Sequence, residues 1–357
     1  PNGVPNISAW VRGKKVADPR NASTVAWTAN PALIIRDYLT TPVKSGGAGA
    51  TTLEFNDVFT TSAANTCDEI VSTTSIIVST SAVDTSGDTF TLQGSTIRVF
   101  TGDRVQVSST GSVPTGLSSG VDYYVIPTQR HTTLKTKFAT SFENAMAGTA
   151  IDITGSGSGN ISVIKTGEPR YNLNGMLLLD SAPNKIIGEM LTSMGGRAVY
   201  ATGAWRLFAA AWQQPSLILD EDDFVGPISV QTRASRRDRF NAVKGVYVTV
   251  LNFDQPSDYP PITNSTYEAE DNSERIYREL DLPHTNRPHT AMRLAKIELE
   301  RHRQMIVATG TLNLVGLQVQ AGDVVQITNS RFGWVNKSFE IAEWKLATNI
   351  GEDLSLG

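Results

Sequence analysis

A Ser/Thr/Gly-rich stretch, from residue 72 to about 165, constrains the fold of this chain more than any other feature. It holds short strand-like runs that turn residues separate at close intervals: "TIRVF", "DRVQVSS", "VDYYVIP" and "AIDIT". Runs of this kind predict strands, and only residues 141–146 favour a helical turn. We assign residues 76–165 to a small all-β module.

The chain before the module has a mixed pattern of helix and strand. Asn30 can cap a helix through "NPALIIRDYLT", with Pro31 in its first turn. A second helix is expected around residues 62–71. The preceding "VPNISAWVRGKKVA" predicts a hairpin that turns at Gly13, and residues 1–29 are assigned to it.

The same pattern resumes after the module. Asp180 or Ser181 can cap a helix with Pro183 in its first turn, because apolar residues then repeat at helical spacing. Strands follow at "RAVYA" and "AWRLFAAAW". Residues 30–75 and 166–227 are therefore expected to form one α+β domain that the module interrupts.

The last part of the chain, residues 228–357, is mostly strand-like. "GVYVTVL" alternates as a half-buried strand does, and one helix is expected at about 290–303. The end, "GLQVQAGDVVQITNSRFGWVNKSFEIAEWKL", predicts three strands of a small barrel. The fold class is accordingly α+β and predominantly β.

The composition excludes several classes of protein. The 357 residues are 40% hydrophobic and 18% charged, as expected for globular domains. A formal net charge of −4 argues against a dedicated nucleic-acid-binding protein. No apolar run approaches the ~18 residues of a membrane span. The single cysteine, Cys67, excludes an internal disulfide and is expected to be buried as a small apolar side chain.

The sequence contains no recognisable motif for catalysis, a cofactor or a metal ion. Its four histidines lack ligand partners nearby, and "EAEDNSER" is expected to be a polar loop. Four adjacent acids could hold a metal or hydrolyse a glycoside, but neighbouring side chains of an extended chain point in different directions. These acids are Asp220, Glu221, Asp222 and Asp223. A solvated or ion-paired loop is favoured over a hydrolase, so the chain is predicted to be no enzyme and to need no cofactor or metal.

A basic cluster, "RASRRDRFNAVKG", follows the acidic run. It contains one acidic residue, Asp238, and five basic residues: Arg233, Arg236, Arg237, Arg239 and Lys244. Such a cluster would suit the phosphates of nucleic acid. The strand-like "PISVQT" joins it to the acidic run, so carboxylates are a second class of partner.

Two aromatic residues of the module, Tyr123 and Tyr124, are candidates for a glycan or protein contact. Adjacent residues of a strand face opposite sides of the sheet. One of the two is therefore expected to belong to the core.

Several stretches, in this order, resemble the central tail hub proteins of long-tailed phages, and in particular the tip attachment protein J family of lambda-like phages. They cover nearly all of the chain outside the module. They are "VPNISAWVRGKKVADPR", "NPALIIRDYLT", "AANTCDEIV", "RYNLNGML", "LTSMGGRAVYATGAWRL", "DDFVGPISVQTRASRRDRFNAVKGVYV", "AEDNSERIYRELDLP", "AMRLAKIELERHRQ" and "GLQVQAGDVVQITNSRFGWVNKSFEIAEW".

The resemblance implies a structural protein of the virion tail tip that is assembled in the host cytoplasm. Hubs of this family are homotrimers in which tail-tube-like β-barrel domains are joined to a smaller α+β domain. They close the tail tube, anchor the central fibre and open for DNA ejection. The implied partners are the distal tail protein, other tail-tip proteins, the tape measure protein and the central fibre, and DNA passes through without specific binding.

Two departures limit the resemblance. Family members are much longer, and this chain begins without an initiator methionine, so we expect it to be a piece of a longer polypeptide or a processed product. Receptor binding is therefore not carried over. The module interrupts the family pattern and is similar to small β domains of phage tail and fibre proteins, which gives a glycan-binding adhesin module as the alternative function.

The hub architecture bears on the basic cluster. Tight contacts between arginine and phosphate, repeated by trimer symmetry, would retard DNA that has to slide through the channel. We therefore predict that Arg233, Arg236, Arg237 and Arg239 bind carboxylates within or between protomers and brace the framework. Asp220, Asp222 and Asp223 are the expected partners.

Overall fold

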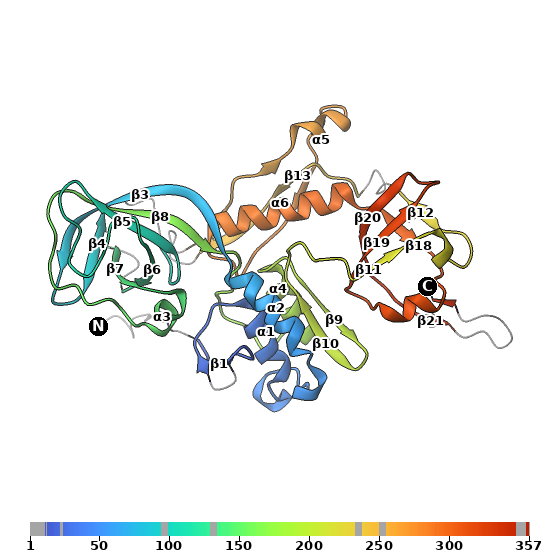
Figure 1. Cartoon of the computed structure of the whole chain (residues 1–357), viewed down its shortest axis with the longest axis horizontal. Helices are drawn as coiled ribbons and strands as arrows, with labels where there is room; N and C mark the ends of the chain where they lie inside the picture. Colours follow the sequence, from blue (N-terminus) through green and yellow to red (C-terminus); the bar gives the residue numbers. More distant parts are fainter. Residues whose placement is uncertain are drawn as a thin grey trace, which may run out of the picture. The chain divides into compact units, whose positions relative to one another are not determined.

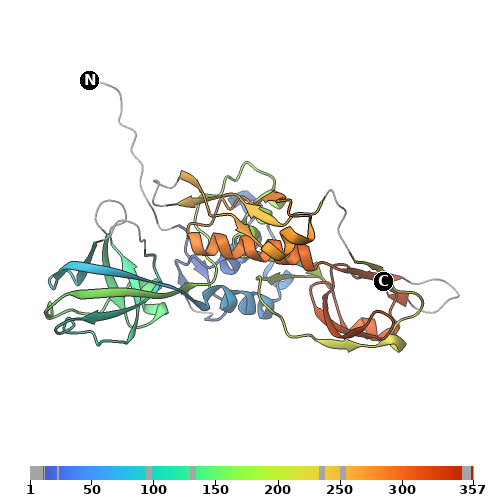
Figure 2. The same cartoon turned by 90° about the horizontal axis from the view of Figure 1, so that it is seen from above.

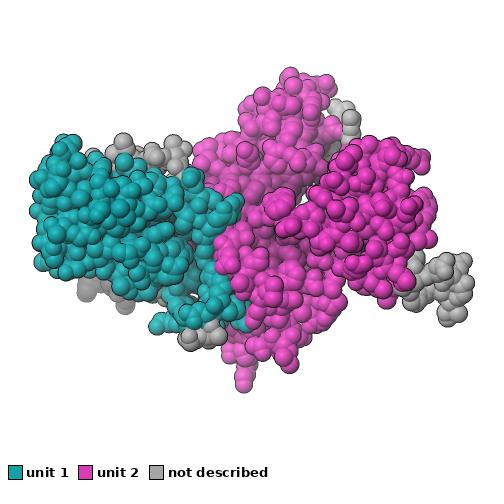
Figure 3. All heavy atoms as spheres, viewed as in Figure 1, with its two compact units in different colours: residues 1–37, 68–170 teal, residues 38–67, 171–357 magenta. Residues whose placement is uncertain are grey.

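The computed structural model divides the chain into two compact units (Figures 1 and 3). Unit 1 comprises Pro1–Asp37 and Asp68–Arg170, and unit 2 comprises Tyr38–Cys67 and Tyr171–Gly357. The described residues are 11, 13–21, 24–93, 99–128, 134–232, 238–249, 255–347 and 355–356. Within them, no helix is both long and apolar enough to cross a lipid bilayer.

Unit 1 contains a closed six-stranded β-barrel, which includes the predicted all-β module. Each strand pairs antiparallel with its two neighbours around the barrel. In spatial order they are β3 (Ile70–Asp84), β4 (Thr89–Gln93), β7 (Leu134–Ala139), β6 (Asp122–Pro127), β5 (Arg104–Ser109) and β8 (Ile161–Pro169). A short helix, α3 (Phe142–Ala147), lies close to the predicted helical turn, and the Ser141 hydroxyl caps it by accepting the Asn144 N–H at 3.1 Å.

The interior of this barrel is filled by side chains. Strand β5 alternates between half-buried and buried positions, so Val105 and Val107 point inward, as a period of two requires. They pack with Tyr123, Val125 and Phe138 in one apolar cluster. The barrel is therefore a packed core and not a channel.

The first described residues of unit 1 precede this barrel. Strands β1 (Val16–Ala17) and β2 (Val25–Ala26) form a two-stranded sheet. Helix α1 (Pro31–Thr40) then begins where the sequence predicts, because the Asn30 side-chain oxygen accepts the N–H groups of Ala32 and Leu33 at 3.1 and 3.4 Å. Residues 1–10 and 12, which hold most of the expected hairpin, lie outside the described residues.

Helix α2 (Asp57–Asp68) differs from the expected helix at 62–71. It begins earlier because the Asn56 side chain accepts the Val58 N–H at 3.1 Å. It ends earlier because Ile70 starts β3 and pairs with Pro169. The expected burial of Cys67 is confirmed, whereas Ile70 and Val71, at the end of the expected helix, are strand residues and only partly buried.

The next elements of unit 2 are a helix and a hairpin. Helix α4 (Pro183–Thr192) has Ala182 at its N-cap, so the expected caps Asp180 and Ser181 are wrong: Pro183 occupies the first helical position and places the boundary one residue later. The expected strands form an antiparallel hairpin of β9 (Arg197–Ala201) and β10 (Ala204–Phe208).

Two small sheets build the rest of unit 2. One orders β11 (Leu217–Leu219), β19 (Val324–Asn329) and β20 (Trp334–Glu340) around an apolar cluster. The other orders β16 (Ile262–Thr263), β13 (Ala242–Lys244) and β17 (Tyr277–Glu279), and helix α6 (Pro288–Gln304) packs on β13 and β16. This helix is the long orange one in Figure 2. Its Ala291, Leu294, Ala295 and Leu299 are buried at helical spacing, as expected for an amphipathic helix.

Short pairs of strands and one short helix complete the unit. They are β12 (Ser229–Gln231) with β18 (Val307–Thr309), β14 (Val246–Thr249) with β15 (Gln255–Asp258), β21 (Leu346–Ala347) with β22 (Ser355–Leu356), and helix α5 (Ser265–Glu270).

The expected hub barrels are not found within the described part of this chain outside the module. The stretch at 316–346 was expected to hold three strands, but only β19 and β20 lie within it, and they pair with each other. Its first residues belong to a 3₁₀ helix (Leu314–Gln318), and β21 begins only at its last residue and pairs with β22. Strand β11 from far upstream takes the free edge of β19 in parallel. The described residues there form open sheets, and the described closed barrel is the one that includes the module.

Candidate functional site

A buried carboxylate, Asp271, is the centre of the best-defined polar cluster of unit 2. Its oxygens accept from Arg239 Nη1 at 3.2 Å, Arg303 Nη1 at 2.8 Å and Asn241 Nδ2 at 3.0 Å. Its side chain is only 4% exposed, and that of Arg303 is 8% exposed. We call Asp271, Arg239, Asn241 and Arg303 the Asp271 cluster.

Local structure sets Asp271 in place. It is the C-cap of α5, and the next two residues, Asn272 and Ser273, have φ angles of 60° and 62°. Two consecutive residues in the left-handed region turn the chain back sharply. Residues other than glycine adopt this backbone conformation only at an energetic cost. The Asn241 side chain fixes the returning segment, since it donates to the Glu274 carbonyl at 2.7 Å and accepts the Ile276 N–H at 2.8 Å.

Electrostatics favour the ionised form of this carboxyl. Burial alone would raise the pKa of Asp271, but hydrogen bonds from Asn241 and Arg239 and the charge of Arg303 outweigh it and hold the pKa below its ordinary value. Arg303 is held further by Glu270 at 2.6 Å and by the Tyr267 ring, 4.8 Å from its guanidinium carbon. The cluster is an anion with two cations and an amide around it, which is a framework and not a reactive group.

The acidic run has a local role. Asp220 is the N-cap of a 3₁₀ turn at Glu221–Asp223, with its side chain accepting the Asp222 N–H at 3.0 Å, and Asp223 accepts the Asp220 N–H at 3.0 Å. Glu221 accepts the Ser330 hydroxyl at 2.7 Å, and this bonding lowers the pKa of Glu221. Among the described residues, none of the four acids makes an ion pair with a basic side chain.

The basic cluster lies only partly within the described residues. Arg233, Arg236 and Arg237 lie outside the described residues. Arg239 binds a carboxylate of its own chain, although that carboxylate is Asp271 and not a member of the acidic run. Lys244 lies 3.5 Å from Glu279 across β13 and β17.

The two tyrosines of the module differ in exposure. Tyr123 is 5% exposed, and its hydroxyl accepts the Ser118 N–H at 2.7 Å, so it is the expected core residue and offers no ring face to a glycan. Tyr124 is half-buried, edge-on to Phe142 with ring centres 6.3 Å apart.

His284, His302 and Cys67 pack as structural side chains. His302 stacks on Phe240 with ring centres 3.9 Å apart, and His284 is 5% exposed. Burial lowers the pKa of His284, and Glu189 at 3.8 Å opposes that shift weakly. Cys67 is fully buried beside Met194. Across the described ranges, no group of three His, Cys, Asp or Glu residues could hold a metal ion.

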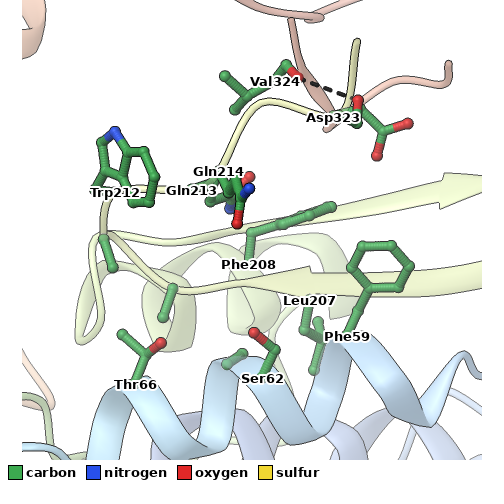
Figure 4. Close-up of a pocket in the computed structure, with 14 residues that line it drawn as sticks. Phe59, Ser62, Thr66, Leu207, Phe208, Trp212, Gln213, Gln214, Asp323 and Val324 are labelled. Carbon is green, nitrogen blue, oxygen red and sulfur yellow. Dashed lines mark hydrogen bonds between the residues drawn. The ribbon is translucent and has the colours of Figure 1, made fainter.

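A surface hollow of about 410 Å³ lies in unit 2 between α2, the end of β10, the following loop and the start of β19 (Figure 4). Its floor is apolar, with Phe59 and Phe208 in edge contact at 5.2 Å. Polar side chains of Ser62, Thr66, Gln213, Gln214 and Asp323 line its rim. Trp212 stands at one side of it and is 80% exposed. We call this feature the Trp212 hollow.

Sequence reasoning missed both the Asp271 cluster and the Trp212 hollow. Asp271 sits in a stretch that reads as a polar loop, and its partners come from segments far away in the sequence. For the hollow, the adjacent Trp and two Gln in "AAAWQQPS" were a usable signal, since an exposed aromatic beside unpaired amides is typical of binding surfaces.

Comparisons with known proteins give weak likenesses. No family model and no curated protein matches the chain. Among solved structures, the virion of a native gene transfer agent particle contains a similar chain, with 15% identity, 49% of this chain and 37% of that chain covered, and a TM-score of 0.38. A 43 kDa tail protein of prophage MuSo2 from Shewanella oneidensis is 11% identical, with 78% of this chain and 96% of that chain covered and a TM-score of 0.35. The prophage tail protein gp18 from Listeria monocytogenes EGD-e gives 10% identity, coverage of 78% and 93%, and a TM-score of 0.30. At this level the likenesses carry no argument about the fold or the function of this chain.

Proposed function

We propose that this chain is a structural protein of a phage tail, and that it serves as the central hub of the tail tip. The proposal rests first on the nine stretches that resemble the hub family in the same order along the chain. The hub would close the tail tube, anchor the central fibre and open for DNA ejection as a homotrimer. Its partners would be the distal tail protein, the tape measure protein and the other proteins of the tail tip.

The observation that carries the proposal is the Asp271 cluster. Its members come from three of the nine resembling stretches: Arg239 from the sixth, Asp271 from the seventh and Arg303 from the eighth. The resemblance therefore includes residues that hold distant segments together. A buried charge with several partners fixes one arrangement of those segments, because each alternative packing would leave a charge unpaired. A hub that bears load along the tail axis needs such a fixed framework.

We propose that the chain has no catalytic role of its own. The acids with the best claim to chemistry, at 220–223, cap a turn and bind Ser330. Replacing all four by Asn is expected to leave any cleavage of peptidoglycan or polysaccharide by tail preparations unchanged. Loss of cleavage with retained folding would favour the hydrolase alternative.

The test of the hub proposal is assembly. The full chain, alone and mixed with tail-tip extracts, is measured by size-exclusion chromatography with light scattering, and tail tips are imaged by electron microscopy with this chain tagged. A trimer that forms a three-fold ring on the tail axis is the expected result. A persistent monomer without affinity for tail components would contradict the proposal.

The basic cluster gives a second test of the same proposal. Changing Arg236 and Arg237 to Glu is expected to impair trimer assembly more than affinity for DNA, because we propose that these side chains brace protein and do not bind phosphate. The opposite ranking would restore the nucleic-acid interpretation.

A further inference from the structure

We propose that the Trp212 hollow is a binding site for a neutral saccharide. The inference goes beyond the hub function and rests on the shape, the unpaired polar groups and the charge of the hollow. Figure 4 shows Phe59, Ser62 and Thr66 rising from α2 toward Leu207 and Phe208, with Trp212 and the two glutamines on the loop above.

The indole of Trp212 is the first part of the argument. Tryptophan buries more apolar surface than any other residue when it packs, yet this one is 80% exposed at the edge of a hollow with an apolar floor. An isolated exposed apolar residue needs no explanation. An exposed ring beside a preformed hollow of about 410 Å³, within the ~300–1,000 Å³ of small-molecule sites, offers a stacking surface.

The polar side chains of the rim are the second part. Within the described part of the chain, the carboxamides of Gln213 and Gln214 and the hydroxyls of Ser62 and Thr66 have no hydrogen-bond partner in the protein. A carboxamide holds a donor and an acceptor in one plane, and a hydroxyl is both. The rim thus presents donors and acceptors together, while the ring presents an apolar face.

Charge is the third part and excludes anionic ligands. Asp323 is the charged member of the lining, and it is already engaged: Arg206 lies 3.5 Å away, and the Gln320 N–H donates to it at 2.9 Å. The guanidinium groups of Arg206 and Arg197 each lie 4.7 Å from a ring centre of the floor, on Phe59 and Phe208, and neither arginine lines the hollow. No lysine or arginine lines the hollow among the described residues, so a phosphate, a sulfate or an acidic sugar would lack a cation.

A neutral pyranose meets all three conditions. One face of the ring carries C–H groups that can stack on the indole, and its edge carries hydroxyls that both donate and accept. A proline-rich peptide also offers a flat ring, but its free polar groups are mainly carbonyl acceptors, which would leave the acceptor oxygens of the rim unpaired. The rim therefore favours a saccharide.

The experiment titrates the full chain with three neutral probes: maltotriose, cellotriose and tri-N-acetylchitotriose. Binding is followed by saturation-transfer NMR of the sugar and by tryptophan fluorescence. We expect at least one probe to bind with a dissociation constant on the order of 1 mM, typical of a single shallow contact site. Trp212→Ala should weaken that binding at least ~10-fold, which corresponds to about 1.4 kcal/mol, and Gln213→Ala with Gln214→Ala should weaken it as well.

The matched control is Tyr200→Ala, since Tyr200 is an aromatic residue of the same unit that is 52% exposed and does not line the hollow. It should leave binding unchanged, and the melting temperatures of all variants should stay at that of the original chain. The proposal is overturned if no probe binds at about 10 mM, or if folded Trp212→Ala binds as tightly as the unchanged chain. Binding of an oligoproline peptide in the hollow without sugar binding would overturn it too. None of these readouts depends on trimer formation, so failure here leaves the hub proposal standing.

Discussion

Replacing Asp271 by Asn tests whether the Asp271 cluster holds unit 2 together. The change keeps the shape of the side chain but removes the charge that Arg239 and Arg303 share, and it turns an N–H₂ group toward donors. Removal of one partner from a buried ion pair costs ~3–5 kcal/mol. Because Arg303 keeps Glu270 at 2.6 Å, we expect the lower end, about 3 kcal/mol.

The same cost can be read as a melting temperature. For a unit of this size, a loss of about 3 kcal/mol lowers the melting temperature by about 6–12 °C. Scanning calorimetry of the full chain measures the shift, and hydrogen-exchange mass spectrometry locates it. Faster exchange is expected in α5, β13 and the end of α6, while exchange in the barrel of unit 1 should not change.

The matched control is Glu279→Gln. Glu279 also faces a basic residue, Lys244 at 3.5 Å, but its side chain is 75% exposed, so its loss should cost about 0–1 kcal/mol. The folded pKa of Asp271 is lowered, so its contribution is complete above an unfolded pKa of about 3.9 and is lost as the pH falls through the folded value. The Asp271→Asn variant should not show this loss of stability at acid pH. If Asp271→Asn and Glu279→Gln destabilise equally, the cluster has no framework role.

Two further predictions concern other buried titratable side chains. In the barrel, Lys165 Nζ lies 3.0 Å from Asp103 and 2.8 Å from Glu168, and all three side chains are nearly inaccessible to solvent. Lys165→Met removes the cation and should destabilise unit 1 by ~3–5 kcal/mol. Hydrogen exchange in β5 and β8 should then be faster, and unchanged exchange there would refute the prediction. In unit 2, burial lowers the folded pKa of His284, so stability should be full above an unfolded pKa of about 6.5 and fall as the pH drops below it. Denaturant titrations between pH 5 and pH 8 check this: His284→Gln should flatten the slope, and an equal slope in both proteins would contradict it.

Local signals in the sequence predicted most helices. Asn30 with Pro31 marked the start of α1, and the apolar spacing in 290–303 marked α6, because both signals act within one or two helical turns. The same logic failed at Asp180 and Ser181, where two good capping residues precede the true boundary at Ala182. Residues near Ile70 read as helix because their spacing fits one, but their strand partner, Pro169, lies on the far side of the module.

The candidate sites were harder to predict, because proximity in the sequence is a poor guide to partners. The acidic run and the basic cluster are neighbours along the chain, yet Asp220 and Asp223 bond to the backbone of their own turn, Glu221 binds Ser330, and Arg239 reaches Asp271. Alternation predicted that one of Tyr123 and Tyr124 is buried, but only the pairing of Val105 with Tyr123 decides which one. The domain boundaries drawn from the sequence stay a prediction.

The chain enters the barrel and leaves it at adjacent points, which makes the barrel easy to gain or lose in evolution. Arg170 N–H donates to the Glu69 carbonyl at 2.8 Å, and Tyr171 N–H donates to the Cys67 carbonyl at 3.1 Å. Where the chain leaves for the barrel and where it returns are thus hydrogen-bonded neighbours. If recombination removes the segment between Glu69 and Arg170, a short turn is enough to join these two residues. A different domain whose ends lie equally close together fits the same insertion point without a change in the rest of the chain.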